Sequence, residues 1–255
     1  MNQLSIVKVG GKIVESLNLL QTFLKDFARI SGFKILIHGG GTTATQIAEK
    51  LGIESQMVDG RRITDPETLK VVTMVYAGLV NKNIVAQLQA INLDAVGLTG
   101  ADMNLMFAAK RPVGQVDYGW VGDIREVNAP ALKYLLEQNY LPVLAPITHD
   151  GKGQLLNTNA DTIACEIAKA LAYDFNVRLI YCFEKKGVLH DEKDENSVIP
   201  NLNKEQFLQY KEDGIIHAGM IPKLDNAFGA IAAGVKEVII TRASDIHSGN
   251  GTYIK

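Results

Sequence analysis

Residues 34–51 read Lys34-Ile35-Leu36-Ile37-His38-Gly39-Gly40-Gly41-Thr42-Thr43-Ala44-Thr45-Gln46-Ile47-Ala48-Glu49-Lys50-Leu51. The short apolar run Lys34–Ile37 is typical of a buried strand, and Thr43–Leu51 has the periodicity of a helix. His38–Gly41 joins them, so a strand is predicted to turn through glycine into a helix. Glycine lets backbone N–H groups approach an anion closely, and the dipole of the following helix favours negative charge. The stretch therefore predicts an α/β fold with an anion site at this turn.

The same alternation of strand and helix continues along the chain. The strands are expected at Leu4–Val9, Asp94–Leu98, Leu141–Ala145, Arg178–Phe183 and Glu237–Thr241, and the helices at Leu17–Ile30, Pro66–Gln89, Thr162–Ala172 and Pro222–Ala233. Asp65 suits the N-cap of the long helix that begins at Pro66. Alternation of this kind favours an open three-layer αβα sandwich with a central, mostly parallel sheet. We expect one domain over residues 1–255, with an N-terminal lobe to about residue 175 and a C-terminal lobe from about 176.

Two segments interrupt this rhythm. Gly114–Val127 contains Tyr118 and Trp120 and predicts a hairpin with an aromatic tip. His190–Asn203 is polar and predicts an excursion on the surface. Neither segment carries a turn-to-helix signal of the kind seen at His38–Gly41, so both are expected to lie outside the main alternation.

Composition narrows the class of protein. The 255 residues are 47% apolar, carry a net charge of −2 and contain two cysteines. Charges of both signs are spread along the chain, which does not favour a nucleic acid or a membrane surface as partner. Cys165 and Cys182 have no metal spacing and suit reduced thiols in the cytoplasm. No signal peptide is recognised, and no stretch approaches the roughly 20 apolar residues of a membrane-spanning helix.

Glycines cluster after three of the predicted strands. The clusters are Gly10-Gly11, Gly39–Gly41 and the pair Gly97 and Gly100. Ligands of open α/β sheets bind beyond the carboxyl ends of strands, although each cluster alone could serve only a tight turn. Gly39-x-Gly41-x-x-Ala44 also fits a loose dinucleotide fingerprint. A Walker A loop is absent, and a lipase oxyanion loop is rejected because the chain has no Gly-x-Ser-x-Gly.

Two lysines stand at the predicted ligand sites. Alternation places Lys8 on the same strand face as Leu4 and Ile6, where an ammonium group needs an anion unless it reaches past the sheet edge. Lys223 follows Pro222 in the first turn of a predicted helix, where a cation opposes the helix dipole. A bound phosphate would reverse that penalty, while the plainer alternative is an exposed surface lysine.

Other polar residues fit either a site or a structural role. Asp161 precedes the Thr162–Ala172 helix and could be its N-cap, or it could hold the two lysines. Asn157 and Asn159 add neutral hydrogen-bonding groups. Arg62 could grip a carboxylate with two parallel hydrogen bonds, or Arg61 and Arg62 could be solvated charge on a loop.

These motifs together resemble one known family. Ile6–Gly11, His38–Gly41, Gly60–Thr64, Asn157–Asp161 and Gly219–Lys223 have the order and spacing of the amino acid kinase family. The resemblance covers essentially the whole chain. The Gly-x-Arg-Ile-Thr and Gly-Met-Ile-x-Lys runs resemble the branch that acts on N-acetyl-L-glutamate rather than carbamate or uridylate kinases.

The resemblance implies a reaction and a set of site residues. The reaction is ATP-dependent phosphorylation of the γ-carboxylate of an N-acyl-L-glutamate, foremost N-acetyl-L-glutamate, to the acyl phosphate in arginine biosynthesis. Lys8 and Lys223 would stabilise the transferring phosphoryl group and Asp161 would organise them. The implied substrate residues are Gly40, Gly41, Arg62, Asn157 and Asn159, with Arg62 on the α-carboxylate. The implied ATP residues are Gly10, Gly11, Gly187, Gly219, Met220 and Lys223, with Mg²⁺ carried by the nucleotide phosphates and no separate protein metal site.

Further expectations come from the same resemblance. Asp117–Gly122 looks like the family's substrate lid. After the Arg178–Phe183 strand the family usually has a Thr/Ser-Asp pair before Gly-Val-Leu. This chain has Phe183-Glu184-Lys185-Lys186-Gly187-Val188-Leu189 there, which leaves the nucleotide contacts around Phe183–Lys186 open. Arginine-inhibited members carry an N-terminal helical extension, whereas this sequence begins at its first strand, so the resemblance suggests an arginine-insensitive homodimer.

Several functions remain in competition at this point. A carboxylate acceptor is ionised at neutral pH and needs no general base, which suits a site of lysines and amides without a placed histidine. The rivals are another carboxylate or carbamate kinase of this fold, a nicotinamide-dependent oxidoreductase, and a non-catalytic metabolite sensor. No single residue distinguishes an acetyl from a succinyl group on the substrate.

Overall fold

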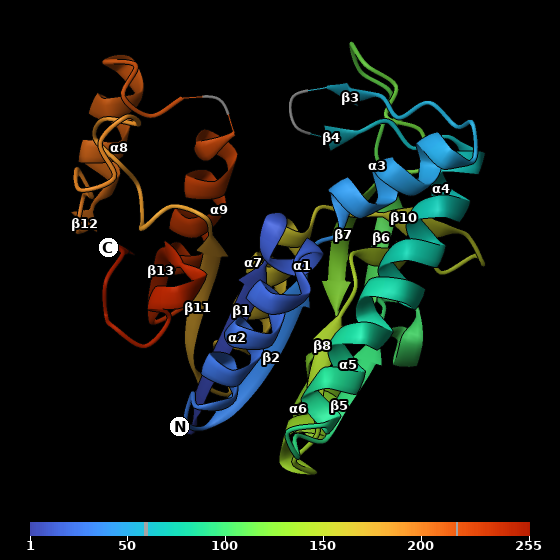
Figure 1. The fold of residues 1–255 in the computed structure, drawn as a ribbon, viewed down its shortest axis with the longest axis horizontal. Helices are drawn as coiled ribbons and strands as arrows, with labels where there is room; N and C mark the ends of the chain where they lie inside the picture. The colour runs from blue at the N-terminus through green and yellow to red at the C-terminus, as the bar shows by residue number, and fades with distance from the viewer. Residues whose placement is uncertain (59–60, 218) are drawn as a thin grey trace.

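The computed structural model describes residues 1–58, 61–217 and 219–255. The strands of its main sheet are β1 (Gln3–Val9), β2 (Phe33–His38), β5 (Ala95–Leu98), β8 (Leu141–Leu144), β11 (Asn176–Phe183), β12 (Asn201–Leu202), β13 (Glu237–Arg242) and β14 (Thr252–Ile254). They lie in the order β12-β14-β13-β11-β1-β2-β8-β5 (Figure 1). The strands from β13 to β5 are all parallel to their neighbours. Strand β14 is antiparallel to β13, and the edge strand β12 is parallel to β14. The predicted, mostly parallel sheet is confirmed.

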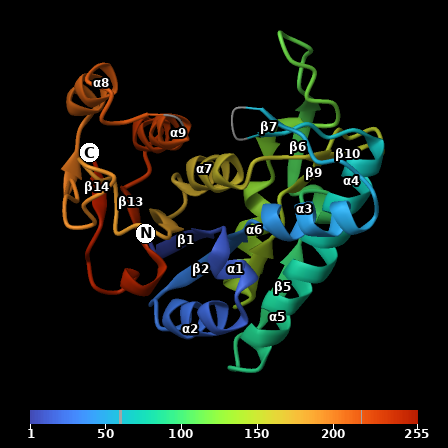
Figure 2. The same ribbon diagram turned by 45° about the horizontal axis from the view of Figure 1, so that its top comes forward.

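Helices cover both faces of this sheet. They are α1 (Lys12–Glu15), α2 (Leu17–Ala28), α3 (Gly41–Lys50), α4 (Pro66–Thr73), α5 (Asn81–Gln89), α6 (Ala129–Glu137), α7 (Ala160–Leu171), α8 (Lys204–Glu212) and α9 (Met220–Ala232). Leu4 and Ile6 of β1 pack into one core with α6–α9, whereas Val7 and Val9 pack into a second core with α2–α5. In Figure 2, α2 and α7 lie on opposite sides of β1 and β2. The three-layer αβα sandwich is confirmed.

The long helix predicted from Pro66 to Gln89 is continuous but not uniform. Met74–Val80 between α4 and α5 is π-helical, a feature that often accompanies functional sites. Asp65 is the N-cap as predicted, since its Oδ1 accepts a hydrogen bond from the Thr68 amide at 2.7 Å. An 18-residue window of this 24-residue helix has a mean hydropathy of 1.2, which by length and composition alone is enough to span a membrane, so the expectation that no stretch approaches this is wrong. Its inward face packs in the second core, as for a core helix of a globular protein.

A four-stranded sheet stands beside the main one. Its strands, in spatial order, are β10 (Leu155–Asn157), β9 (Ile147–His149), β6 (Met106–Lys110) and β7 (Gly122–Val127). The prediction that Gly114–Val127 folds into a hairpin on its own is wrong in its first half. Only Gly122–Val127 is a strand, β7; it pairs with β6, and residues 111–121 connect the two. Gly119 bridges to Thr64, and a Cβ at Gly119 would lie 2.3 Å from the Thr64 carbonyl oxygen. This contact, which sequence periodicity cannot show, holds the connection against the short hairpin of β3 (Met57–Val58) and β4 (Arg61–Arg62).

Most other differences lie at element ends. Helix α7 begins at Ala160 and α9 at Met220, each two residues earlier than predicted. His190–Asn203 is a largely exposed excursion as predicted, but it also contributes β12 to the sheet edge. Helices α1, α6 and α8 were missed; α1 is only one turn long, and α8 buries a single residue, Phe207, so its apolar periodicity is weak.

Candidate active site

Two glycine turns meet at the carboxyl edge of the sheet. The parallel register pairs Val9 of β1 with His38 of β2, and the Gly39 amide donates to the Val9 carbonyl at 2.9 Å. Gly10-Gly11 and Gly39–Gly41 therefore lie side by side, as the sequence predicts. A Cβ at Gly10 would come within 2.6 Å of Lys8 Nζ, and Gly11 has φ +57°. Only glycine leaves this backbone open beside the lysine.

The third predicted glycine cluster does not belong to the site. Gly97 lies inside β5, where a Cβ would meet Asn81 Oδ1 at 2.0 Å. Gly100 is packed against Met106 and Thr148, and a Cβ there would meet both at about 3.0 Å or less. Close packing explains these two glycines, whereas the sequence had offered a ligand site or a tight turn.

One pocket gathers the residues expected to handle phosphate. It has a volume of about 470 Å³ and is lined by Lys8, Gly10, Gly11, Phe183, Glu184, Lys185, Gly187, Glu192, His217, Gly219, Met220 and Lys223. Lys8 Nζ lies 2.8 Å from Asp161 Oδ1, and the two residues are only 8% and 7% exposed. Burial lowers the pKa of Lys223; nearby Asp161 opposes this shift, and the charge of Lys8 adds to it. Lys8, Lys223 and Asp161 together carry one net positive charge, so this corner of the pocket is suited to an anion.

Asp161 is not the N-cap of its helix. Asn159 takes that position, and its Oδ1 accepts hydrogen bonds from the amides of Asp161 at 2.9 Å and Thr162 at 3.0 Å. The Asp161 carboxylate is therefore free to face Lys8 from the first turn of α7. The buried Tyr181 hydroxyl donates to the Asp161 carbonyl at 3.1 Å and fixes the backbone of that turn from β11.

A second pocket contains all five predicted substrate residues. It has a volume of about 190 Å³, and its lining includes Gly40, Gly41, Arg62, Asn157 and Asn159. Buried Arg62 donates through Nη2 to the Gly41 carbonyl at 2.9 Å and to Thr45 Oγ1 at 2.8 Å. Its position is fixed by the start of α3, so it is not a solvated surface charge. Gly60 of the same motif lies outside the described residues.

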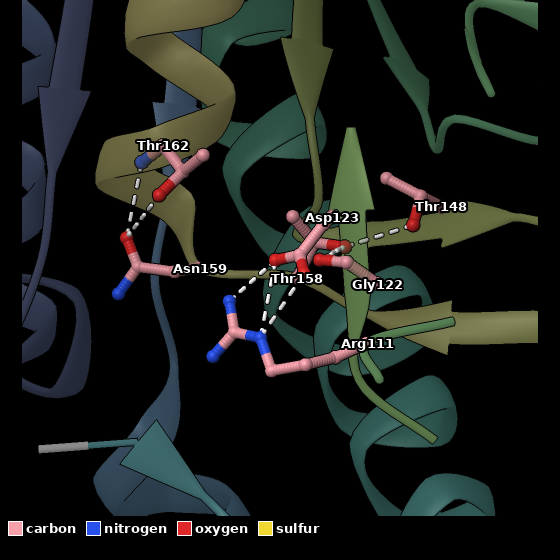
Figure 3. A network of polar contacts seen from close by, with 7 residues as sticks. All are labelled: Arg111, Gly122, Asp123, Thr148, Thr158, Asn159 and Thr162. Atoms are coloured by element: carbon pink, nitrogen blue, oxygen red, sulfur yellow. Dashed lines mark hydrogen bonds and ion pairs between the residues drawn. The ribbon is translucent and has the colours of Figure 1, made fainter. Parts of the chain in front are cut away.

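The pocket wall also contains residues that sequence reasoning missed. Arg111 forms an ion pair with Asp123 across the β6–β7 connection, and Tyr76 of the π-helical turn packs against Gly40 (Figure 3 shows the Arg111 pair). Thr158 donates to the Gly122 carbonyl at 3.2 Å and also bonds Thr148. Antiparallel register brings Arg111 to Asp123, and no local sequence signal reveals this pairing.

Phe183 and Glu184 each contact a lysine. Glu184, which lines the larger pocket, forms an ion pair with Lys12 at 3.1 Å. Phe183 lies beneath Lys223, whose Nζ is 3.8 Å from the ring centroid. Among residues 1–58, 61–217 and 219–255, no group of three His, Cys, Asp or Glu residues is arranged to hold a metal ion.

His38, the last residue of β2, hydrogen-bonds the glycine turn Gly39–Gly41 that follows it. It is fully buried, and its Nδ1–H donates to the Gly39 carbonyl at 2.7 Å while Nε2 accepts from Asn81 Nδ2 at 3.1 Å. Burial lowers its pKa from 6.5 to about 4; the bond to Gly39 opposes this shift and the charge of Lys82 adds to it. At neutral pH the imidazole is uncharged and serves the turn rather than proton transfer.

Comparison with known proteins agrees with this geometry. Residues 3–242 match the profile of the amino acid kinase family. The chain is 64% identical to an acetylglutamate kinase of Parabacteroides distasonis, with 100% of both chains covered, and 62% identical to one of Bacteroides thetaiotaomicron, with 99% and 98% covered. Its fold is similar to that of Giardia lamblia carbamate kinase bound to AMP-PNP, with a TM-score of 0.72, 15% identity, and 98% and 97% of the chains covered.

His38 should make stability depend on pH. The unfolded imidazole takes up a proton near pH 6.5, whereas the folded one does so only near pH 4, so stability is lost as pH falls through this window. We expect this residue to account for a loss of about 2 kcal/mol in unfolding free energy between pH 7.5 and pH 5.0. Urea denaturation at both pH values measures it. The His38→Gln variant should lose about 2 kcal/mol less unfolding free energy than the unsubstituted protein between these two pH values. An equal loss in both proteins would contradict the role given to His38.

Proposed function

The chain belongs to the amino acid kinase family and is a kinase, and we propose that it acts through Lys8, Lys223 and Asp161. Its reaction is the ATP-dependent phosphorylation of N-acetyl-L-glutamate, a step of arginine biosynthesis, given its identity to acetylglutamate kinases over the full length. The observation that carries the residue assignment is the division of the predicted residues between two adjoining pockets, one lined by Lys8 and Lys223 and one lined by Arg62.

The larger pocket is the proposed ATP site. Gly10 and Gly11 leave bare backbone beside Lys8, which is the space a terminal phosphate needs. Gly187, Gly219 and Met220 line the same pocket and serve the rest of the nucleotide. ATP supplies the phosphoryl group, and Mg²⁺ accompanies its phosphates, since ATP use with Mg²⁺ is usual for kinases.

The smaller pocket is the proposed acyl-glutamate site. Arg62 presents a guanidinium, which pairs with the α-carboxylate. Asn157 faces the amide end of the substrate; its Nδ2 donates to Thr64 at 3.0 Å, which leaves its Oδ1 to accept from a substrate N–H. Gly40, with φ +153°, and Gly41 bring backbone against the substrate, and Asn159 borders the pocket at the start of α7.

Phosphoryl transfer then depends on position and charge. The γ-carboxylate is ionised at neutral pH and attacks without a general base, which agrees with the neutral, buried state of His38. Lys8 and Lys223 neutralise charge that develops on the phosphoryl oxygens, and Asp161 holds Lys8 in place. A sensor that keeps the fold without turnover would not need this arrangement of two lysines and one carboxylate.

The arrangement of the chain completes the proposal. The N-terminal lobe to about residue 175 binds acyl-glutamate, and the C-terminal lobe binds ATP, in the cytoplasm. The protein works as a homodimer through the N-terminal lobe. Met74 and Leu79 support this, because these large apolar side chains are 57% and 48% exposed on the outward face of the long helix.

Removal of either lysine should abolish most of the rate. We expect Lys8→Ala and Lys223→Ala each to lower kcat by roughly 10²- to 10³-fold, because each ammonium group stabilises charge in the transition state. An ADP-release assay at saturating substrates measures kcat. Lys236→Ala, an exposed lysine before β13, is the matched control and should keep the full rate. Unchanged kcat in a site variant would remove that lysine from the mechanism.

Substrate choice tests the acceptor pocket. The same assay should show turnover with N-acetyl-L-glutamate and little with free glutamate, aspartate or carbamate, while N-succinyl-L-glutamate reports the tolerance for a larger acyl group.

The Arg62 guanidinium is tested by a conservative variant. Arg62→Lys should raise KM for the acyl-glutamate by roughly 10- to 100-fold, because lysine lacks the planar guanidinium that makes two parallel hydrogen bonds to a carboxylate. Arg29→Lys, remote from this pocket, should behave as the unsubstituted enzyme. Turnover with non-acylated substrates alone would rule the proposal out.

Light scattering during gel filtration tests the dimer. The protein should elute with twice the mass of one 27.8 kDa chain. Met74→Glu combined with Leu79→Glu should give a folded monomer, since charges would be buried against the partner. A monomeric unsubstituted protein at micromolar concentration would contradict this part of the proposal.

A further inference from the structure

The ring of Phe183 faces both lysines of the ATP pocket. Lys223 Nζ lies 3.8 Å and Lys8 Nζ 5.2 Å from the ring centroid. Both distances are within the range of about 6 Å over which an ammonium group is attracted to the negative face of an aromatic ring. One side chain thus contacts the two groups assigned to the transferring phosphoryl.

The two lysines are not equally compensated by acidic groups. Lys8 has the Asp161 carboxylate at 2.8 Å. Within the part of the chain that the structure describes, no carboxylate lies within 4.0 Å of the Lys223 ammonium. Lys223 is also partly buried near a second positive charge, which favours its movement out to solvent. Asp161 offsets part of this repulsion from a longer distance, and the face of Phe183, 3.8 Å from Lys223 Nζ, offsets it by direct contact.

The ring itself is held by the same cluster. Tyr181 stacks on Phe183 with centroids 6.2 Å apart and 13° between planes. The Tyr181 hydroxyl donates to the Asp161 carbonyl, and Tyr181 pairs in register with Lys8 of β1. Phe183, the last residue of β11, is therefore fixed relative to the lysine–carboxylate pair by strand pairing and by stacking.

We propose that Phe183 is a positioning residue that holds the Lys223 ammonium beside Lys8 at the phosphoryl site through the face of its ring. This role rests on the proposed function of the two lysines.

The role has a consequence for the pH profile of the rate. Titratable groups from several elements surround Lys223. They are Lys8 of β1, Asp161 of α7, Tyr181 of β11, Glu184 and Lys185 of the turn after β11, Glu192, and His217 before α9. Weakening the ring's negative face removes an attraction for the protonated amine and leaves the other groups unchanged. The alkaline limb of kcat/KM should then move to lower pH.

The sharpest experiment changes the electrons of the ring but hardly its shape. Phenylalanine carrying one, two or three fluorines is incorporated at position 183 of the full-length protein, and kcat is measured for each. We expect kcat to fall stepwise, by about tenfold for three fluorines, which corresponds to about 1.4 kcal/mol. The same series at Phe27, buried against Phe23 in the second core, is the control and should be flat.

Two ordinary variants separate positioning from structure. Phe183→Tyr should retain the rate, whereas Phe183→Leu should lower kcat more than it changes KM for ATP and shift the alkaline limb. A flat fluorine series, or a Phe183→Leu variant that loses thermal stability without a shift of the limb, overturns the role of Phe183 even if Lys223→Ala is impaired. Full activity of Lys223→Ala would instead overturn the proposed function, and this role with it.

Discussion

Lys8 and Asp161 form a buried ion pair between the central strand and the first turn of α7. Burying two charges costs free energy that their attraction alone rarely recovers, and removing one partner leaves the other charge uncompensated. The free-energy cost of burying this pair is therefore high for a purely structural contact. Such a pair suits a site that binds an anion. It also requires that β1, β11 and α7 keep their relative positions, so the geometry of the site depends on the packing of the sandwich.

The parallel sheet determines how the two pockets adjoin. Strands β1 and β2 end in register, and their two glycine turns face the same side. The first turn serves the pocket with the lysines, and the second serves the pocket with Arg62. His38 lies beneath the second turn in its neutral form and hydrogen-bonds the Gly39 carbonyl, so this residue stabilises the backbone that borders the acceptor pocket.

Two residues at the end of β11 have charged partners in this chain. Phe183 contacts the two lysines of the larger pocket, and Glu184 pairs with Lys12. An aromatic face can attract an ammonium group without a carboxylate's full negative charge, which would repel the phosphates of a nucleotide. Phe183 thus contacts Lys223 without adding a negative charge to the pocket.

Local sequence patterns were enough to predict the layers of the fold and two groups of residues that line two pockets in the structure. Strand and helix periodicity are local, and glycine turns at strand ends are constrained by the backbone, so Lys34–Leu51 and Ile6–Gly11 could be interpreted without the structure. Only the tertiary structure decided that Asn159 rather than Asp161 caps α7, that Gly97 and Gly100 serve packing, and that Arg111 meets Asp123. These outcomes depend on register and on contacts between distant segments, such as Phe183 with Lys8 and Lys223, and no local pattern encodes them.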